Sequence, residues 1–205
     1  MSAHRRILVA TRSRHKLGEL RDLLGLPATE LLSLDDLGAP GDADEDGPTF
    51  EANALIKARW GLAATGLPTL ADDSGIEVEA LGWGPGVRTR RYGGDHATDA
   101  QNNVKLLAAL AGLPSERRAA RYVCVLAFLA RADAAPIVCR GTFVGRIASG
   151  PRGRGGFGYD PIFEPAAEPP GGRTVGQMSA AAKNAVSHRA VAARTMREAL
   201  RALGY

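Results

Sequence analysis

RRILVATRSRHKLGELRDLLG, residues 5–25, holds two periodicities in succession. The apolar run in residues 5–11 is typical of a short buried strand. After a basic turn, leucines recur at helical spacing: Leu17, Leu20 and Leu24. Gly25 then supplies the residue that commonly ends a helix. The segment therefore predicts a strand, a turn and a helix, the repeating unit of α/β folds.

The same two patterns continue along the rest of the chain. Strands are predicted at residues 29–34, 75–81, 120–131, 135–148 and 161–165, and helices at 50–65, 98–111 and 179–203. Thr49 and Ser179 are placed to cap the helices that they precede. The consecutive strands on either side of a polar turn at Asp133 predict an antiparallel hairpin. No repeat or linker interrupts the pattern, so we expect one domain over residues 1–205 with a mixed sheet.

The composition is that of a globular enzyme, with 205 residues, 45% apolar and 23% charged. The longest apolar stretches, such as residues 122–130, are shorter than the roughly 20 residues of a membrane span. Residues 1–13 lack the apolar core of a signal peptide. Cys124 and Cys139 form no CxxC pair and are interpreted as small buried residues. These features predict a cytoplasmic protein without a membrane partner or a disulfide.

The net charge of +4 raises the question of nucleic acid. Arginines are spread over the whole chain, however, and neither an RNA-binding aromatic pattern nor zinc-finger spacing accompanies them. We expect no nucleic-acid partner, and a basic balance also suits a polyphosphate substrate. A basic nucleic-acid-binding module is kept as the alternative from another class of protein.

LADDSGIEV, residues 70–78, contains two adjacent carboxylates, Asp72 and Asp73. The aspartates and serine are compatible with a plain turn at a strand end. If both carboxylates pointed at one site, they would repel each other unless a cation lay between them. Mg²⁺ favours a few carboxylates together with substrate phosphates. The acidic loop at residues 42–46 adds Glu45 as a further oxygen donor, although alone it is typical of a solvated charged run.

The turn TRSRHK, residues 11–16, lies where the first strand meets the first helix. Backbone amides, hydroxyl groups and a lysine at a helix N-terminus favour an anion. Positive residues in a first turn oppose the helix dipole, which makes a bound phosphate the better explanation than a simple cap. The Walker pattern occurs nowhere in the chain, so this phosphate site would differ from a P-loop.

Two further stretches carry candidate binding residues. Gly153, Gly155 and Gly158 match G-x-G-x-x-G, but an extended segment follows where a dinucleotide site needs a helix. A flavin or NAD binder is therefore a minor alternative, and Phe157 is better placed to stack on a flat ring. In the stretch at residues 183–192, a break in the helix would allow its cationic and imidazole side chains to face one ligand: Lys183, His188 and Arg189.

Five stretches in this order resemble the inosine triphosphate pyrophosphatase family: TFEANALIKA, LADDSGIEVEALG, PGVRTRRYGG, GGFGYDPIF and KNAVSHR. The resemblance runs from Ile7 to about Ala193. It implies an elongated mixed α/β sheet in two lobes with flanking helices and a central nucleotide cleft. It also implies a Mg²⁺-dependent hydrolase of ITP, dITP and XTP, and a homodimer.

The resemblance assigns roles by position. Asp73, Asp72 and Lys57 take catalytic places, and Asp73 and Glu45 take metal places. The substrate places fall on Thr11, Arg12, Ser13, Arg14, His15, Lys16, Ser74, Phe157, Gly158, Tyr159, Asp160, Lys183, His188 and Arg189. Ser13 stands where the family usually has Asn, and Ala52 and Ala182 stand where relatives often have acidic residues.

The implied reaction releases pyrophosphate by cleavage between the α and β phosphates. Lys16, Lys57 and the metal would offset the growing charge, and His188 and Arg189 would donate to a 6-oxo purine. A Maf-like pyrophosphatase acting on pyrimidine or modified nucleotides is the alternative within the same reaction class.

Overall fold

The computed structural model describes residues 5–205. The expectation that the chain has no leader also depends on residues 1–4, which lie outside the described residues. Among the helices of residues 5–205, none combines the length and the apolar character that crossing a membrane requires.

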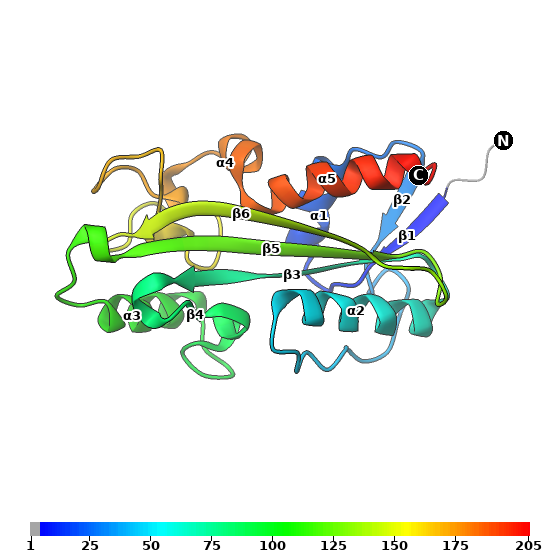
Figure 1. Cartoon of the computed structure of the whole chain (residues 1–205), viewed down its shortest axis with the longest axis horizontal. Coiled ribbons are helices and arrows are strands. Elements are labelled where there is room, and N and C mark those ends of the chain that lie inside the picture. Colours follow the sequence, from blue (N-terminus) through cyan, green and yellow to red (C-terminus); the bar gives the residue numbers. More distant parts are fainter. Residues whose placement is uncertain (1–4) are drawn as a thin grey trace. The chain divides into compact units, whose positions relative to one another are not determined.

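A mixed seven-stranded sheet is the centre of the fold (Figure 1). Its order is β2 (Thr29–Leu32), β1 (Arg5–Val9), β3 (Thr69–Val78), β5 (Ala119–Leu129), β6 (Ile137–Ile147) and β7 (Phe163–Pro165). The short β4 (Gly84–Pro85) pairs with β3. The contacts of β1 with β2 and β3 are parallel, whereas β4 and β7 pair antiparallel with their neighbours. The predicted mixed α/β fold is confirmed.

Within residues 5–205, five α-helices accompany the sheet: α1 (Arg14–Leu24), α2 (Phe50–Thr65), α3 (Asp99–Ala109), α4 (Ala180–Val186) and α5 (His188–Ala202). Local signals set the limits of α1 and α2. Ser13 and Thr49 accept backbone hydrogen bonds at the two N-termini, and Gly25 and Gly66 end the helices with positive φ. The bounds predicted for the helix at residues 50–65 are those of the structure.

The chain forms two compact units. Unit 1 contains the described residues up to Asp73, together with Cys124–Gly141 and Arg189–Tyr205. Unit 2 contains Ser74–Val123 and Thr142–His188. Each unit has its own apolar core, and β3, β5 and β6 contribute residues to both. Cys124 and Cys139 are free and buried in unit 1, as predicted.

Three expectations about local structure were wrong. The aspartate pair lies inside the continuous ten-residue strand β3, because cationic side chains from the helices pair with both carboxylates. The five glycines and one proline of residues 82–94 predict irregular structure, but Gly86–Arg91 forms a 3-10 helix. The single helix predicted at residues 179–203 is two helices, α4 and α5, separated by Ser187 in an extended conformation, which is the break considered for residues 183–192.

Candidate functional site

Asp72 and Asp73 point to opposite faces of β3, because side chains alternate along a strand. Asp72 contacts side chains from α1 and α5, whereas Asp73 contacts one from α2. Figure 1 shows α1 and α5 on one face of the strands of unit 1 and α2 on the other. The two carboxylates therefore do not point at one site, which was one of the arrangements that the sequence left open, and each has its own partners.

Asp72 belongs to a buried ionic cluster and is only 5% exposed. Lys16 Nζ donates to its Oδ1 at 2.5 Å, and Arg189 Nη2 lies 3.2 Å from its Oδ2. Arg189 also pairs with Glu19, and Cys124 Sγ donates to Asp72 Oδ2 at 3.4 Å. Burial alone would raise the pKa of Asp72, but the charges of Lys16 and Arg189 hold that pKa well below its usual value. Asp72 is thus a permanent carboxylate.

Asp73 has a different environment, although it is nearly as buried. Its Oδ1 lies 3.1 Å from Lys57 Nζ, and Lys57 Nζ also lies 2.7 Å from Glu45 Oε2. Burial, together with the charges of Asp72 and Glu45, raises the pKa of Asp73 above its ordinary value despite the opposing charge and hydrogen bond of Lys57. Burial would lower the pKa of Lys57, but the negative charges of Asp73, Asp72 and Glu45 raise it above its usual value. The amine of Lys57 is therefore an ammonium.

The remaining oxygen of Asp73, Oδ2, is buried and has no hydrogen-bond partner within residues 5–205. A buried acceptor of this kind is suited to a ligand such as a cation or a water molecule. No group of three His, Cys, Asp or Glu side chains gathers there, or elsewhere in the described part of the chain, to enclose a metal alone. The carboxylates of Asp73 and Glu45 are oxygen donors of the kind that a hard divalent cation accepts when water and phosphate oxygens complete its shell.

The turn between β1 and α1 is shaped by Ser13. Its hydroxyl accepts from the backbone N–H of Lys16, and its own backbone N–H donates to Thr11 Oγ1. Arg14 and His15 follow as exposed residues of the first helical turn. Ser13 is therefore the helix cap, and Lys16 is directed to Asp72. Contacts of Thr11, Ser13, Arg14, His15 and Lys16 with phosphate stay predictions.

Arg12 has a role that the sequence did not indicate. Its guanidinium lies 2.5 Å from Asp35 and 3.0 Å from Asp42. It also donates to the backbone carbonyls of Ala39 and Gly41. Four contacts therefore fasten the loop that leads to Glu45, and Arg12 is engaged with protein groups where a phosphate contact was expected.

In unit 2, Phe157–Asp160 forms a turn around the carboxylate of Asp160, which is 2% exposed. The backbone N–H of Phe157 donates to Asp160 Oδ2 at 2.9 Å, and Lys183 Nζ lies 2.7 Å from the same oxygen. The ammonium of Lys183 also lies 4.2 Å from the centre of the Phe157 ring. The structure thus brings together three residues that the resemblance assigned to substrate places: Phe157, Asp160 and Lys183.

Tyr122 joins this group, and sequence reasoning missed it. Its hydroxyl donates to Asp160 Oδ1 at 3.2 Å, and its ring stacks on His188 with centroids 4.8 Å apart and planes at 10°. Burial, followed by the charge of Asp160, raises the pKa of Tyr122 well above its usual value, so the phenol keeps its proton. The alternation of side chains along β5 could have predicted that Tyr122 is buried, but the neighbouring sequence does not indicate which residues it contacts.

The sequence pattern grouped His188 and Arg189 in one binding site, but the structure places them in different units. The boundary between the two units falls between these neighbours, just after the break at Ser187. His188 stacks on Tyr122 in unit 2, whereas Arg189 is 1% exposed and pairs with Asp72 in unit 1. The expected donation from Arg189 to a purine does not fit this buried ion pair. Ser74, the first residue of unit 2, is half-buried on β3.

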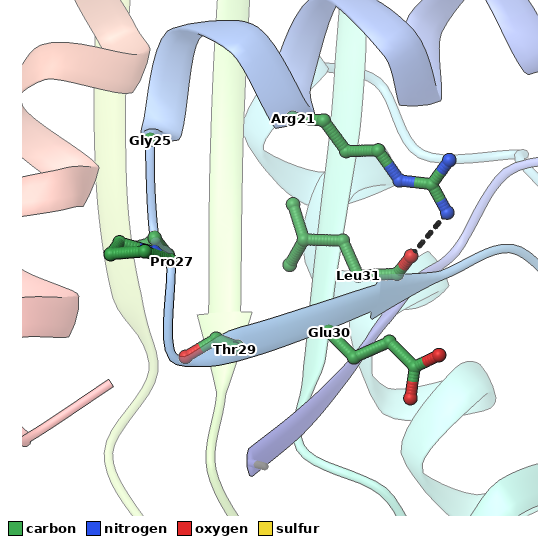
Figure 2. Close-up of a pocket in the computed structure, with 7 residues that line it drawn as sticks. Arg21, Gly25, Pro27, Thr29, Glu30 and Leu31 are labelled. Carbon is green, nitrogen blue, oxygen red and sulfur yellow. Dashed lines mark hydrogen bonds between the residues drawn. The ribbon is translucent and has the colours of Figure 1, made fainter.

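A hollow of about 600 Å³ in unit 1 lies beside the end of α1 and the strand β2 (Figure 2). Gly25, Thr29 and Glu30 are among its lining residues. Arg21 also lines it, and its guanidinium donates to the carbonyl of Leu31 at 2.6 Å (Figure 2). None of the predicted catalytic, metal or substrate residues lines this hollow, so it is no part of the candidate site.

The model of the Ham1 family matches residues 7–199. The chain belongs to the Ham1 family. A dITP/XTP pyrophosphatase from Mycolicibacterium paratuberculosis is 50% identical over 200 residues, which cover 96% of each chain. The dITP/XTP pyrophosphatase of Shigella flexneri is 43% identical over 197 residues, covering 96% of this chain and 98% of that protein.

Solved structures place the fold with the Ham1 family as well. A HAM1 protein from Coxiella burnetii superposes with a TM-score of 0.87 at 40% identity, covering 96% of this chain and 98% of that one. The family match does not support the Maf-like alternative. The literal G-x-G-x-x-G match is accidental, because Asp160–Ile162 is a 3-10 helix that leads into β7, where a dinucleotide site needs a long helix.

Proposed function

We propose that this protein is a nucleoside triphosphate pyrophosphatase that hydrolyses dITP, ITP and XTP to the nucleoside monophosphate and pyrophosphate. The names of the curated relatives support this substrate class. The observation that carries the proposal is the state of Asp73. It is buried, its pKa is raised, one oxygen contacts Lys57, and the other has no partner among the described residues.

Asp73 is the general base of this reaction. Its raised pKa makes it a stronger proton acceptor than an ordinary aspartate. It takes a proton from water as the water oxygen bonds to the α-phosphorus. The bond from that phosphorus to the oxygen bridging the α and β phosphates then breaks, and its electron pair leaves with pyrophosphate.

Asp73 and Glu45 would hold Mg²⁺, which supplies Lewis-acid stabilisation of the phosphate charge when bound. Lys57 contacts both of these carboxylates. Its positive charge lowers the electrostatic repulsion between them. Since Glu45 is exposed and Asp73 is not, Glu45 is the carboxylate that can exchange Lys57 for another cation with little rearrangement.

Lys16 supplies positive charge to the triphosphate from the turn between β1 and α1. Its partner Asp72 is a permanent carboxylate, so the ammonium is held in one position before a substrate arrives. Thr11 and Ser13 belong to the same turn and would add hydroxyl contacts. In this assignment Asp72 serves catalysis by holding Lys16, and Asp73 performs the proton transfer.

The base would be bound in unit 2 by Phe157, Lys183 and His188, with Gly158, Tyr159 and Asp160 shaping the turn. A 6-oxo purine accepts hydrogen bonds from the Lys183 ammonium and the His188 imidazole. The 6-amino group of adenine is itself a donor, so it would face the donors of the protein without forming a hydrogen bond. A buried polar group left unpaired in this way costs about 1 to 3 kcal/mol. That difference favours inosine and xanthosine nucleotides over adenosine nucleotides.

The test is a panel of triphosphates assayed with Mg²⁺ and with separate detection of pyrophosphate and orthophosphate. We expect pyrophosphate from dITP, ITP and XTP, and values of kcat/KM lower by about 10-fold or more for dATP. Release of orthophosphate, or equal turnover of dTTP and UTP, would contradict the proposal. A homodimer is a prediction of the family resemblance and a cytoplasmic location is a prediction of the sequence, and sedimentation and cell fractionation test them.

A further inference from the structure

One residue of the base-binding turn is held from outside the site, by α3. Asp99 Oδ2 accepts from the backbone N–H of Gly158 at 2.7 Å, and Asn103 Nδ2 donates to the carbonyl of the same Gly158 at 3.1 Å. Asp99 and Asn103 are four residues apart, so they lie on one face of the helix. Together they hold both polar backbone groups of a single residue.

The turn held in this way has little freedom to be rebuilt. Gly158 has a φ of +61°, a conformation that favours glycine. A Cβ at Gly156 would lie 2.0 Å from Asp160 Oδ2, so the chain must pass close to that carboxylate. On either side of Gly158 stand Phe157, whose ring contacts Lys183, and Tyr159, whose hydroxyl donates to Thr89. A shift of Gly158 would therefore move the rings of Phe157 and Tyr159.

The neighbouring Asn102 on the same helix is an asparagine whose contacts serve only the local structure. It is 2% exposed, accepts from the N–H of Gly93 and donates to the carbonyl of Arg90. Asn103 is 8% exposed and uses only its donor, since its Oδ1 has no partner within residues 5–205. A buried unpaired acceptor lowers stability, so stability alone accounts for Asn103 less well than for Asn102.

We propose that Asp99 and Asn103 are positioning residues for purine recognition, which act by fixing Gly158 and, through it, the ring of Phe157. Neither residue is assigned a contact with substrate. The inference deepens the proposed function and rests on it for its kinetic readout. It predicts that loosening this contact weakens the binding of the base while the hydrolytic step, which belongs to unit 1, proceeds at its usual rate.

The experiment compares Asn103→Ala with Asn102→Ala, two identical changes at adjacent buried positions of one helix. Asn103→Ala should raise the KM for dITP about 10-fold, the upper range for one lost hydrogen bond, with kcat unchanged. Asn102→Ala should lower the melting temperature at least as much, because it loses two bonds, yet leave KM within about 2-fold. Asp99→Ala should raise KM, and Asp99→Asn, which keeps an acceptor oxygen, should restore it.

Hydrogen exchange at the Gly158 amide supplies a readout that needs no activity. We expect faster exchange in Asp99→Ala than in the wild type and no change in Asn102→Ala. Equal KM values for Asn103→Ala and Asn102→Ala, or unchanged exchange at Gly158, would overturn the positioning role. If the wild type released no pyrophosphate from dITP, the proposed function would fail instead, and the exchange measurement would still decide whether α3 fixes the turn.

Discussion

Asp72 and Asp73 are adjacent on β3, yet the pKa of the first is lowered and the pKa of the second is raised. The difference arises from the partners on the two faces of the strand. Asp72 faces two cations, Lys16 and Arg189, whereas Asp73 shares its single cation, Lys57, with Glu45. The same substitution should therefore affect mainly stability at Asp72 and mainly catalysis at Asp73.

Asp72→Asn should destabilise the protein. The substitution removes the carboxylate that pairs with the buried guanidinium of Arg189, and breaking a buried pair costs about 3 to 5 kcal/mol. Denaturation in urea, monitored by circular dichroism, measures the free energy of unfolding. A loss below about 1 kcal/mol would show that the cluster does not stabilise the fold.

Asp73→Asn should abolish activity with little effect on folding. Loss of the general base lowers kcat by about 10²- to 10⁴-fold. Because the raised pKa means that the carboxylate is less favoured in the folded protein than in the unfolded chain, a neutral amide should not lower the melting temperature greatly. The measurement is pyrophosphate release together with a thermal melt. Retained activity in Asp73→Asn would remove the basis of the proposed mechanism.

The pH dependence should have opposite signs for the two groups. The folded pKa of Asp72 is depressed, so its stabilising contribution is present above the ordinary value of 3.8 and is lost as pH falls below it. The folded pKa of Asp73 is raised, so its carboxylate reduces stability as pH rises through that pKa, and kcat declines as pH falls through it. Unfolding and rate profiles of wild type and Asp72→Asn between about pH 3 and pH 8 separate these effects.

Lys57→Met should move the acid limb of the rate profile to higher pH. The ammonium of Lys57 lowers the pKa of Asp73, so its removal leaves burial and the charges of Asp72 and Glu45 to raise that pKa further. The variant should also have a lower kcat. A control is Lys105→Met, which removes a lysine whose ammonium contacts Tyr92 in unit 2. An acid limb that shifts to lower pH in Lys57→Met would contradict the assignment of the base.

Arg12→Gln should raise the Mg²⁺ concentration needed for half-maximal activity. Arg12 fastens the loop before Glu45, and loss of groups that orient a metal ligand commonly costs about 10-fold or more in metal affinity. Arg59→Gln, the same change at an exposed position of α2, serves as the control. An unchanged Mg²⁺ requirement in Arg12→Gln would show that the loop is held without it.

The parts of this fold that depend on local chemistry could be predicted from the sequence. The bounds of α2 follow from Thr49 at one end and Gly66 at the other. The strand through Asp72 and Asp73 could not be predicted, because its charges are compensated by residues that are distant in sequence. Arg189 and Glu19 are separated by 170 positions, and no periodicity reports such a pair.

The same limit applies to the candidate site. Motifs identified the turn at Phe157 and its partner Lys183, since both belong to glycine-rich or basic stretches that stand out in a sequence. Tyr122 and Asn103 lie in an ordinary strand and an ordinary helix, and only the folded chain reveals that they contact Asp160 and Gly158.

The thiol of Cys124 lies beneath the ionic cluster, fully buried and next to Asp72, and burial followed by that negative charge raises its pKa well above the usual value. A protonated, inaccessible sulfur does not react with alkylating reagents while unit 1 is closed. The rate at which iodoacetamide labels Cys124 therefore reports how often the core around the ionic cluster opens. A native residue thus serves as the probe for local unfolding of unit 1.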